Sequence, residues 1–210
     1  YTLTCASVSS NNSNTRSIAF GTGNITVTGN NAAVWALATL TGYTLTGTPV
    51  LNCTYSGATG TRTIQNGSTA GGAESNAISV NVSAGTDILT FTSSATNAML
   101  NIDLTGFAGT HTSGAYNVYG NYKIVTGITW TANANAINFK ASSGTQKLTT
   151  GGITIDQPIA QNNAGATLQL QDNITLGSTR AFTLVGGTFD MAGKTLSANK
   201  FVHSGAVTRA

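Results

Sequence analysis

Three aspartates in the last third of the chain are the side chains best spaced for chemistry. Asp156, Asp172 and Asp190 follow one another at nearly equal intervals. If the backbone coils with a similar period, their carboxylates would stack into a row that could supply acid, base or calcium ligands for polysaccharide cleavage. The alternative is that each aspartate caps a turn or a strand end. We favour the alternative, because glycoside cleavage needs a convergent pair in a cleft, and we predict no catalytic residue, metal site or cofactor.

The histidines and serines give no stronger signal. His111 and His203 have no Cys, His or acidic neighbour at the spacing of metal ligands, which indicates turn or solvent histidines. The serines include no Gly-x-Ser-x-Gly sequence, the usual setting of an exposed nucleophile. Nucleophilic catalysis therefore has no support in the sequence.

The two cysteines, Cys5 and Cys53, both lie in strand-like contexts. Small buried core residues are the simplest interpretation. A disulfide between them stays open, but two cysteines in a chain of this length are not a disulfide framework and do not define a compartment.

Two patterns could form a binding surface. Tyr116, Tyr119 and Tyr122 are the densest aromatic cluster and could contact a cell-surface glycan, although packing between strands is the favoured interpretation. Thr-x-Thr recurs, and a flat, regular threonine array could bind ice. Its spacing along the sequence is irregular, however, and threonine is common in strands. The motif occurs at Thr2/Thr4, Thr26/Thr28, Thr44/Thr46, Thr61/Thr63, Thr90/Thr92 and Thr129/Thr131.

Composition excludes several classes of protein. Only 7% of residues are charged, whereas 40% are hydrophobic and the net charge is +3. Disorder is not expected at that hydrophobicity and charge, and the apolar runs are far shorter than the roughly 20 residues of a membrane helix. The basic residues are scattered instead of clustered with aromatics, which argues against nucleic-acid binding. Thr, Asn, Ser and Gly must therefore supply most of the polar surface.

Alternating apolar and polar residues, separated by glycine-rich turns, predict an all-β fold. A β-solenoid with irregular rungs is the leading interpretation, and a β-sandwich is the alternative. We expect a strand-rich part at 1–65, a loop or boundary at 66–77 and a solenoid part at 78–210, or one continuous elongated domain. The clearest alternating segments are 24–28, 43–46, 50–55, 78–82, 88–92, 100–104, 128–131, 153–156, 168–171 and 182–185.

The two ends of the chain also resemble each other. Lys194-Thr-Leu-Ser resembles Tyr1-Thr-Leu-Thr, and an ungapped alignment of the two places Thr208-Arg209 on Thr15-Arg16. This favours a superperiod of almost the whole chain, as in stacked arrays whose units bury their edges against one another. The start at Tyr1 shows no signal peptide, and we expect the chain to be a segment of a longer protein.

The stretches Leu168-Gln-Leu-Gln-Asp-Asn-Ile-Thr-Leu-Gly-Ser-Thr-Arg and Gly187-Thr-Phe-Asp-Met-Ala-Gly-Lys-Thr-Leu resemble repeats of large proteins of marine bacteriophages and marine metagenomes. Ser9-Ser-Asn-Asn-Ser-Asn-Thr-Arg-Ser-Ile-Ala-Phe resembles the segment that follows in those repeats. The resemblance implies a structural, non-enzymatic segment of a virion appendage or fibre, on the virion surface or outside the cell. Its expected partners are further copies, other repeats or virion proteins, and a host glycan. A cellular filament or adhesin and a polysaccharide-degrading β-helix enzyme are the alternatives.

Overall fold

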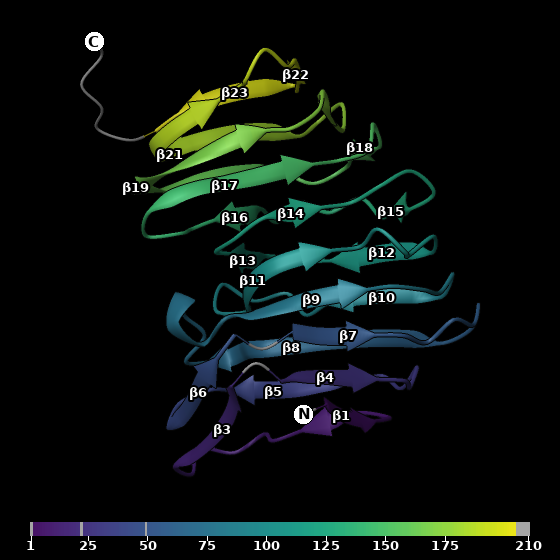
Figure 1. Cartoon of the computed structure of the whole chain (residues 1–210). Coiled ribbons are helices and arrows are strands. Elements are labelled where there is room, and N and C mark those ends of the chain that lie inside the picture. Colours follow the sequence, from purple (N-terminus) through teal and green to yellow (C-terminus); the bar gives the residue numbers. More distant parts are fainter. Residues whose placement is uncertain (1, 22, 49, 205–210) are drawn as a thin grey trace.

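The strands stack in parallel into a β-solenoid of about 9 turns. The computed structural model describes residues 2–21, 23–48 and 50–204. β1 lies at one end of the stack and β23 at the other (Figure 1). The prediction of an all-β solenoid is confirmed, and the sandwich alternative is wrong. Within the described residues no helix is long and apolar enough to cross a membrane.

Each coil has three sides, and the first, which we call face 1, is a continuous parallel sheet. Its ladder runs from coil to coil between Thr2 and Asp190. Its strands are β1 (Thr2–Cys5), β4 (Asn24–Val27), β7 (Val50–Cys53), β9 (Ile78–Val82), β14 (Tyr122–Lys123), β17 (Gly144–Thr149) and the C-terminal parts of β11 (Ala98–Asp103), β19 (Ile159–Leu170) and β21 (Ala181–Asp190).

Face 2 follows face 1 in every coil. It consists of a six-stranded and a three-stranded parallel sheet, joined where the Asn133 N–H donates to the Asp156 carbonyl oxygen at 2.8 Å. The six strands are β2 (Val8–Ser9), β5 (Trp35–Thr39), β8 (Thr61–Ala70), β10 (Ile88–Phe91), β12 (Thr110–Ser113) and β15 (Thr129–Trp130), and the three are β18 (Thr154–Ile155), β20 (Ile174–Leu176) and β22 (Leu196–Ser197).

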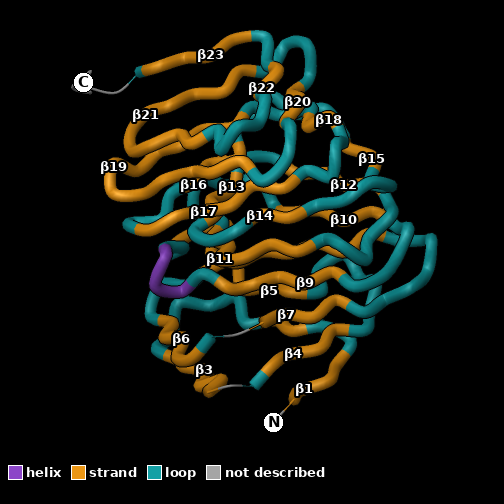
Figure 2. The backbone as a smooth tube through the Cα atoms, turned by 45° about the horizontal axis from the view of Figure 1, so that its top comes forward, coloured by secondary structure: helices purple, strands orange, loops and turns teal. Residues whose placement is uncertain are grey.

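Face 3 completes the coil and carries the one helix of the described residues. In Figure 2 the short 3-10 helix η1 (Glu74–Asn76) projects from this side, between β6 and the strands of the later coils. The strands of face 3 are β3 (Arg16–Gly21), β6 (Tyr43–Gly47), β13 (Tyr116–Val118), β16 (Ile137–Phe139), β23 (Lys200–His203) and the N-terminal parts of β11, β19 and β21.

Inward side chains stack from coil to coil because successive residues of a strand point to opposite sides. On face 1 the ladder aligns Leu3, Ile25, Leu51, Val80, Ile102, Tyr122, Leu148 and Leu170. On face 3 it aligns Tyr116, Ile137, Ile159, Phe182 and Phe201. The buried members of these columns belong to one apolar core that runs through the stack. Burial of their apolar surface stabilises the fold by about 25 cal/mol per Å².

The expected boundary at 66–77 does not interrupt the fold. Residues 66–70 continue β8, so the loop prediction is wrong for them, whereas a turn and η1 occupy most of 71–77. Asn66 looks like a loop residue but is buried, and its Nδ2 donates to the Ala98 and Asn76 carbonyls at 2.7 and 3.0 Å. Strands β7 and β9 pair directly across the segment, and the core is continuous there.

The coils differ in length, in agreement with the prediction of irregular rungs. Paired residues in successive coils are separated by as few as 19 positions, between Ala98 and Asn117, and by as many as 31, between Thr39 and Ala70. The predicted superperiod does not correspond to equivalent positions, because Thr2–Cys5 lies on face 1 and Leu196–Ser197 lies on face 2. A Thr-Leu-Thr or Thr-Leu-Ser sequence fits any strand with one inward residue, which explains the misleading match.

Candidate functional site

The three aspartates do not form a row. Asp190 pairs with Gln169 on face 1, whereas Asp156 follows β18 on face 2. Asp156 accepts a hydrogen bond from Arg180 Nε at 2.6 Å. Hydrogen bonds from the Gln169 side chain and the Ala192 backbone lower the pKa of Asp190. The stacked-carboxylate hypothesis is therefore wrong, because the aspartates are 16 and 18 residues apart, whereas paired residues of successive coils on face 2 are 21 and 22 positions apart there.

Asp172 caps a corner of the coil below it. Its carboxylate accepts from the backbone N–H of Thr150 at 3.0 Å and from that of Gly151 at 2.6 Å. Gly151 has φ of 60°, which lies in the left-handed region that glycine adopts without strain. This is the turn-capping role that the sequence favoured.

Replacing Asp172 by alanine should lower the free energy of unfolding by about 1–3 kcal/mol, because two backbone donors lose their acceptor. Urea unfolding followed by circular dichroism would measure the change. Asp190→Ala is the matched control, since Asp190 accepts from one backbone N–H, that of Ala192, and from the Gln169 side chain, and it should cost less. Equal costs for the two variants would contradict a capping role for Asp172.

The tyrosine cluster lies mainly in the core. Tyr116 and Tyr122 are fully buried, and the Tyr116 hydroxyl donates to that of Tyr122 at 3.0 Å. Burial raises the pKa of both. Tyr119, between β13 and β14, is half-buried. Direct glycan contact by Tyr116 and Tyr122 is therefore ruled out, and strand packing, the favoured interpretation, accounts for them.

The cysteines are free thiols. Cys5 pairs with Val27 and Val27 with Cys53, so the cysteines are two coils apart. That separation is about 10 Å, beyond the roughly 7 Å that a disulfide spans between Cα atoms. Burial raises the pKa of the Cys53 thiol to about 12, which makes it unreactive.

His111 is a core residue, not a turn histidine. Its ring packs edge-on against Phe91 and Trp130, and its Nε2 lies 3.2 Å from the Ser113 hydroxyl, which in turn donates to Gln157 at 3.3 Å. Burial lowers the pKa of His111 to about 3, and the nearby Leu89 backbone opposes this only in part. A neutral imidazole sealed among aromatic rings has no route to a substrate. His203, in β23, is exposed, as expected.

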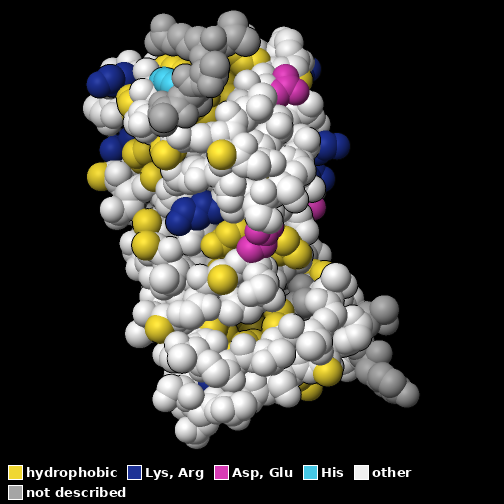
Figure 3. All heavy atoms as spheres, turned by 90° about the vertical axis from the view of Figure 1, so that its left-hand side faces the viewer, with side chains coloured by type: hydrophobic (Ala, Val, Ile, Leu, Met, Phe, Trp, Pro, Cys, Tyr) yellow, Lys and Arg dark blue, Asp and Glu magenta, His cyan; other side chains and the backbone are white. Residues whose placement is uncertain are grey.

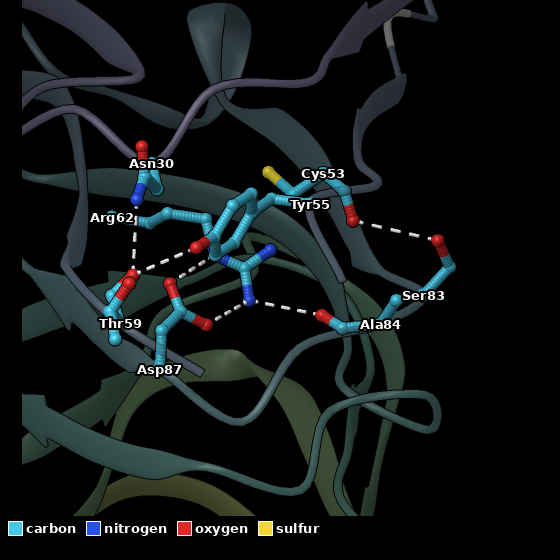
Figure 4. Close-up of polar contacts among 8 residues, drawn as sticks. All are labelled: Asn30, Cys53, Tyr55, Thr59, Arg62, Ser83, Ala84 and Asp87. Carbon is cyan, nitrogen blue, oxygen red and sulfur yellow. Dashed lines mark hydrogen bonds and ion pairs between the residues drawn. The ribbon is translucent and has the colours of Figure 1, made fainter. Parts of the chain in front are cut away.

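An ion pair that sequence reasoning missed joins β8 to the segment before β10 (Figure 4). Arg62 and Asp87 are both completely buried. Two hydrogen bonds join them: Arg62 Nε donates to Asp87 Oδ2 at 2.8 Å, and Arg62 Nη2 donates to Asp87 Oδ1 at 2.6 Å. Nη2 also donates to the Ala84 carbonyl at 3.0 Å, and the rings of Tyr55 and Phe107 lie within 6 Å of the guanidinium carbon. The one feature of the sequence that could have indicated this ion pair is the position of Arg62 between Thr61 and Thr63, where the alternation of the strand places an inward residue.

The two ends of the stack expose apolar surface. At the first coil a cavity of about 350 Å³ opens beside Leu3, Val8, Ile18, Phe20 and Ile25, with Thr2, Ala19, Gly23 and Asn24 completing its wall. At the last coil the Phe201 ring stacks on Phe182, with centroids 5.6 Å apart and an interplanar angle of 12°. Leu3 is 54% and Phe201 52% exposed. Each is the terminal member of an inward column, uncovered because no described coil lies beyond it.

Face 1 carries a smaller hollow of about 210 Å³ lined by Asn121, Tyr122, Lys123, Lys147, Thr149 and Gln171. Its two ammonium groups and amides suit an anionic or hydroxyl-rich ligand. Lys123 lies 3.9 Å from Asp103, and both of these side chains are about half-exposed. Because this ion pair is solvated, Lys123 is free to turn toward a ligand.

The charged side chains elsewhere are few and separated, and Figure 3 shows the side occupied by face 3 as mostly uncharged. Among the described residues, no three His, Cys, Asp or Glu side chains are grouped to hold a metal ion. The geometry thus offers an open apolar surface at each end and a hollow on face 1. Comparison with protein-family models, with curated proteins and with solved structures found no match for the chain.

Proposed function

We propose that the chain is a structural, non-enzymatic segment of a fibre that extends by end-to-end stacking of solenoid coils. The observation that carries the proposal is the pair of open ends, where Leu3 and Phe201 end inward columns that are otherwise buried. The fibre would belong to a virion appendage at the virion surface, or to an extracellular filament of a cell. Its partners would be further copies, other repeats or other virion proteins.

The order of the faces supports continuation in the same direction. The last coil passes through face 1, face 2 and face 3 as β21, β22 and β23, and the first coil passes through the same faces as β1, β2 and β3. A second copy placed on β23 would therefore present face 1 where face 1 comes next. Head-to-tail contacts of this kind do not close and generate filaments, and they pair strand edges that would otherwise be open.

Charge at either end should abolish this assembly. We expect wild-type protein to form filaments visible by electron microscopy, and both Leu3→Asp and Phe201→Asp to sediment as monomers, because each buries a carboxylate in the apolar junction. A mixture of the two variants should form only dimers, since one variant keeps a free first coil and the other a free last coil. Sedimentation velocity would separate these species.

The same experiment contains its control. Ile88→Asp introduces the same charge at an exposed apolar side chain in the middle of the stack, and filaments should persist. Dimers of Leu3→Asp alone would indicate that last coils pair with each other. Compact monomers of the wild type would contradict end-to-end assembly.

The hollow on face 1 supports a second, additional role, contact with an anionic host glycan. Lys123 and Lys147 would provide the charge, and Asn121 and Gln171 would provide the amides. A polysaccharide-cleaving role is not proposed, because the three aspartates that would have supplied its carboxylates are dispersed and engaged in structural hydrogen bonds.

A further inference from the structure

Face 2 carries a regular grid of threonines across four neighbouring coils, which we call the threonine grid. One column consists of Thr61, Ile88, Thr110 and Thr129, and the other of Thr63, Thr90, Thr112 and Thr131. The ladder places these residues directly opposite one another from β8 to β15. Their spacing along the sequence is irregular only because the coils differ in length, and in space it is regular.

The backbone holds the grid in place. The residue between the two columns is inward in each strand, and Arg62, Leu89 and His111 are completely buried. Neighbouring strands lie about 4.8 Å apart, and alternate residues of one strand lie about 6.7 Å apart. The Thr112 and Thr131 hydroxyls approach to 3.2 Å, so the register of β12 and its neighbour extends to their side chains.

The chemistry of the grid is uniform and uncharged. Seven of its eight positions are threonine, and the eighth is Ile88, which is exposed. A threonine hydroxyl donates and accepts hydrogen bonds as water does, and the methyl group beside it restricts the orientation of nearby water. The two hollows described above are lined by other residues.

We propose that the threonine grid binds the surface of ice. A flat, neutral array that repeats in two dimensions is complementary to a partner with the same regularity. The crystal face of ice is such a partner, with water molecules at similar repeats. A protein partner would be expected to meet aromatic, Met or Arg side chains, and the grid positions hold none of these. This role is independent of the proposed fibre function.

Ice recrystallisation and thermal hysteresis assays on the purified protein would test this activity. The wild type should slow the growth of ice grains and shape single crystals. Thr112→Tyr, which raises a bulky ring from the centre of the grid, should lose most of this effect, whereas Ile88→Thr, which completes the grid, should increase it. Thr175→Tyr is the matched control, because Thr175 is an exposed threonine of β20 outside the grid, and it should behave like the wild type.

Circular dichroism would establish that each variant is folded. No effect of the wild type on ice would overturn the proposal. So would an ice effect that Thr112→Tyr and Ile88→Thr leave unchanged, since another surface would then be responsible. Neither result depends on filament formation, because the assays can use the monomeric Phe201→Asp variant alongside the wild type.

Discussion

Replacing Asp87 by alanine is expected to lower the free energy of unfolding by about 3–5 kcal/mol. The substitution leaves the Arg62 guanidinium buried without its carboxylate, in an interior where an unpaired charge is poorly solvated. Tyr55 and Phe107 would still contact the guanidinium, but the attraction of two aromatic rings replaces only part of the stabilisation by a carboxylate that accepts two hydrogen bonds. Chemical denaturation of the wild type and the variant would measure the loss.

Two further variants separate the ion pair from general effects. Lys123→Ala removes a partner of the exposed pair with Asp103 and should change the unfolding free energy by less than about 1 kcal/mol. The double variant Arg62→Met/Asp87→Leu should be more stable than Asp87→Ala, because apolar side chains of similar size leave no buried charge. A double variant that is as unstable as the single one would show that packing, not charge, dominates the site.

Acidification from pH 7 to pH 5 is expected to destabilise the protein through His111. The folded-state pKa is about 3, below the ordinary value of 6.5, so the unfolded chain takes up the proton first. The contribution of the neutral, buried His111 to the free energy of unfolding is therefore complete above pH 6.5. It is lost as the pH falls toward 3, by roughly 1.4 kcal/mol for each pH unit in between. We therefore expect His111 to account for most of the change in stability between pH 7 and pH 5.

His111→Gln provides the comparison, since glutamine does not titrate and can still hydrogen-bond with Ser113. We expect this variant to be less stable than the wild type at pH 7, but its stability should vary much less between pH 7 and pH 5. Guanidinium unfolding at the two pH values would show the difference. An equal pH dependence in both proteins would mean that the imidazole is accessible to protons in the folded state.

The strands could be predicted from the sequence because their inward and outward positions alternate, as in Ile78-Ser-Val-Asn-Val, a buried strand of face 1. The pairing of strands could not, because it depends on coil lengths, and these are set by corners of variable size. Because coil lengths were unknown, the aspartates were wrongly considered as a possible row, and the threonine grid could not be recognised. For the same reason the ion pair between Arg62 and Asp87 could not be predicted, because it depends on the pairing of β8 with β10.

The matched order of faces at the two ends has a consequence for how such a chain can change in length. Inserting or deleting one complete coil alters the length of the stack by about 4.8 Å and leaves the two end surfaces in the same rotational setting. Inserting part of a coil would instead rotate one end against the other, so that the order of faces at the two ends would no longer match. Length can therefore vary by whole coils while the two end surfaces keep their orientation relative to each other.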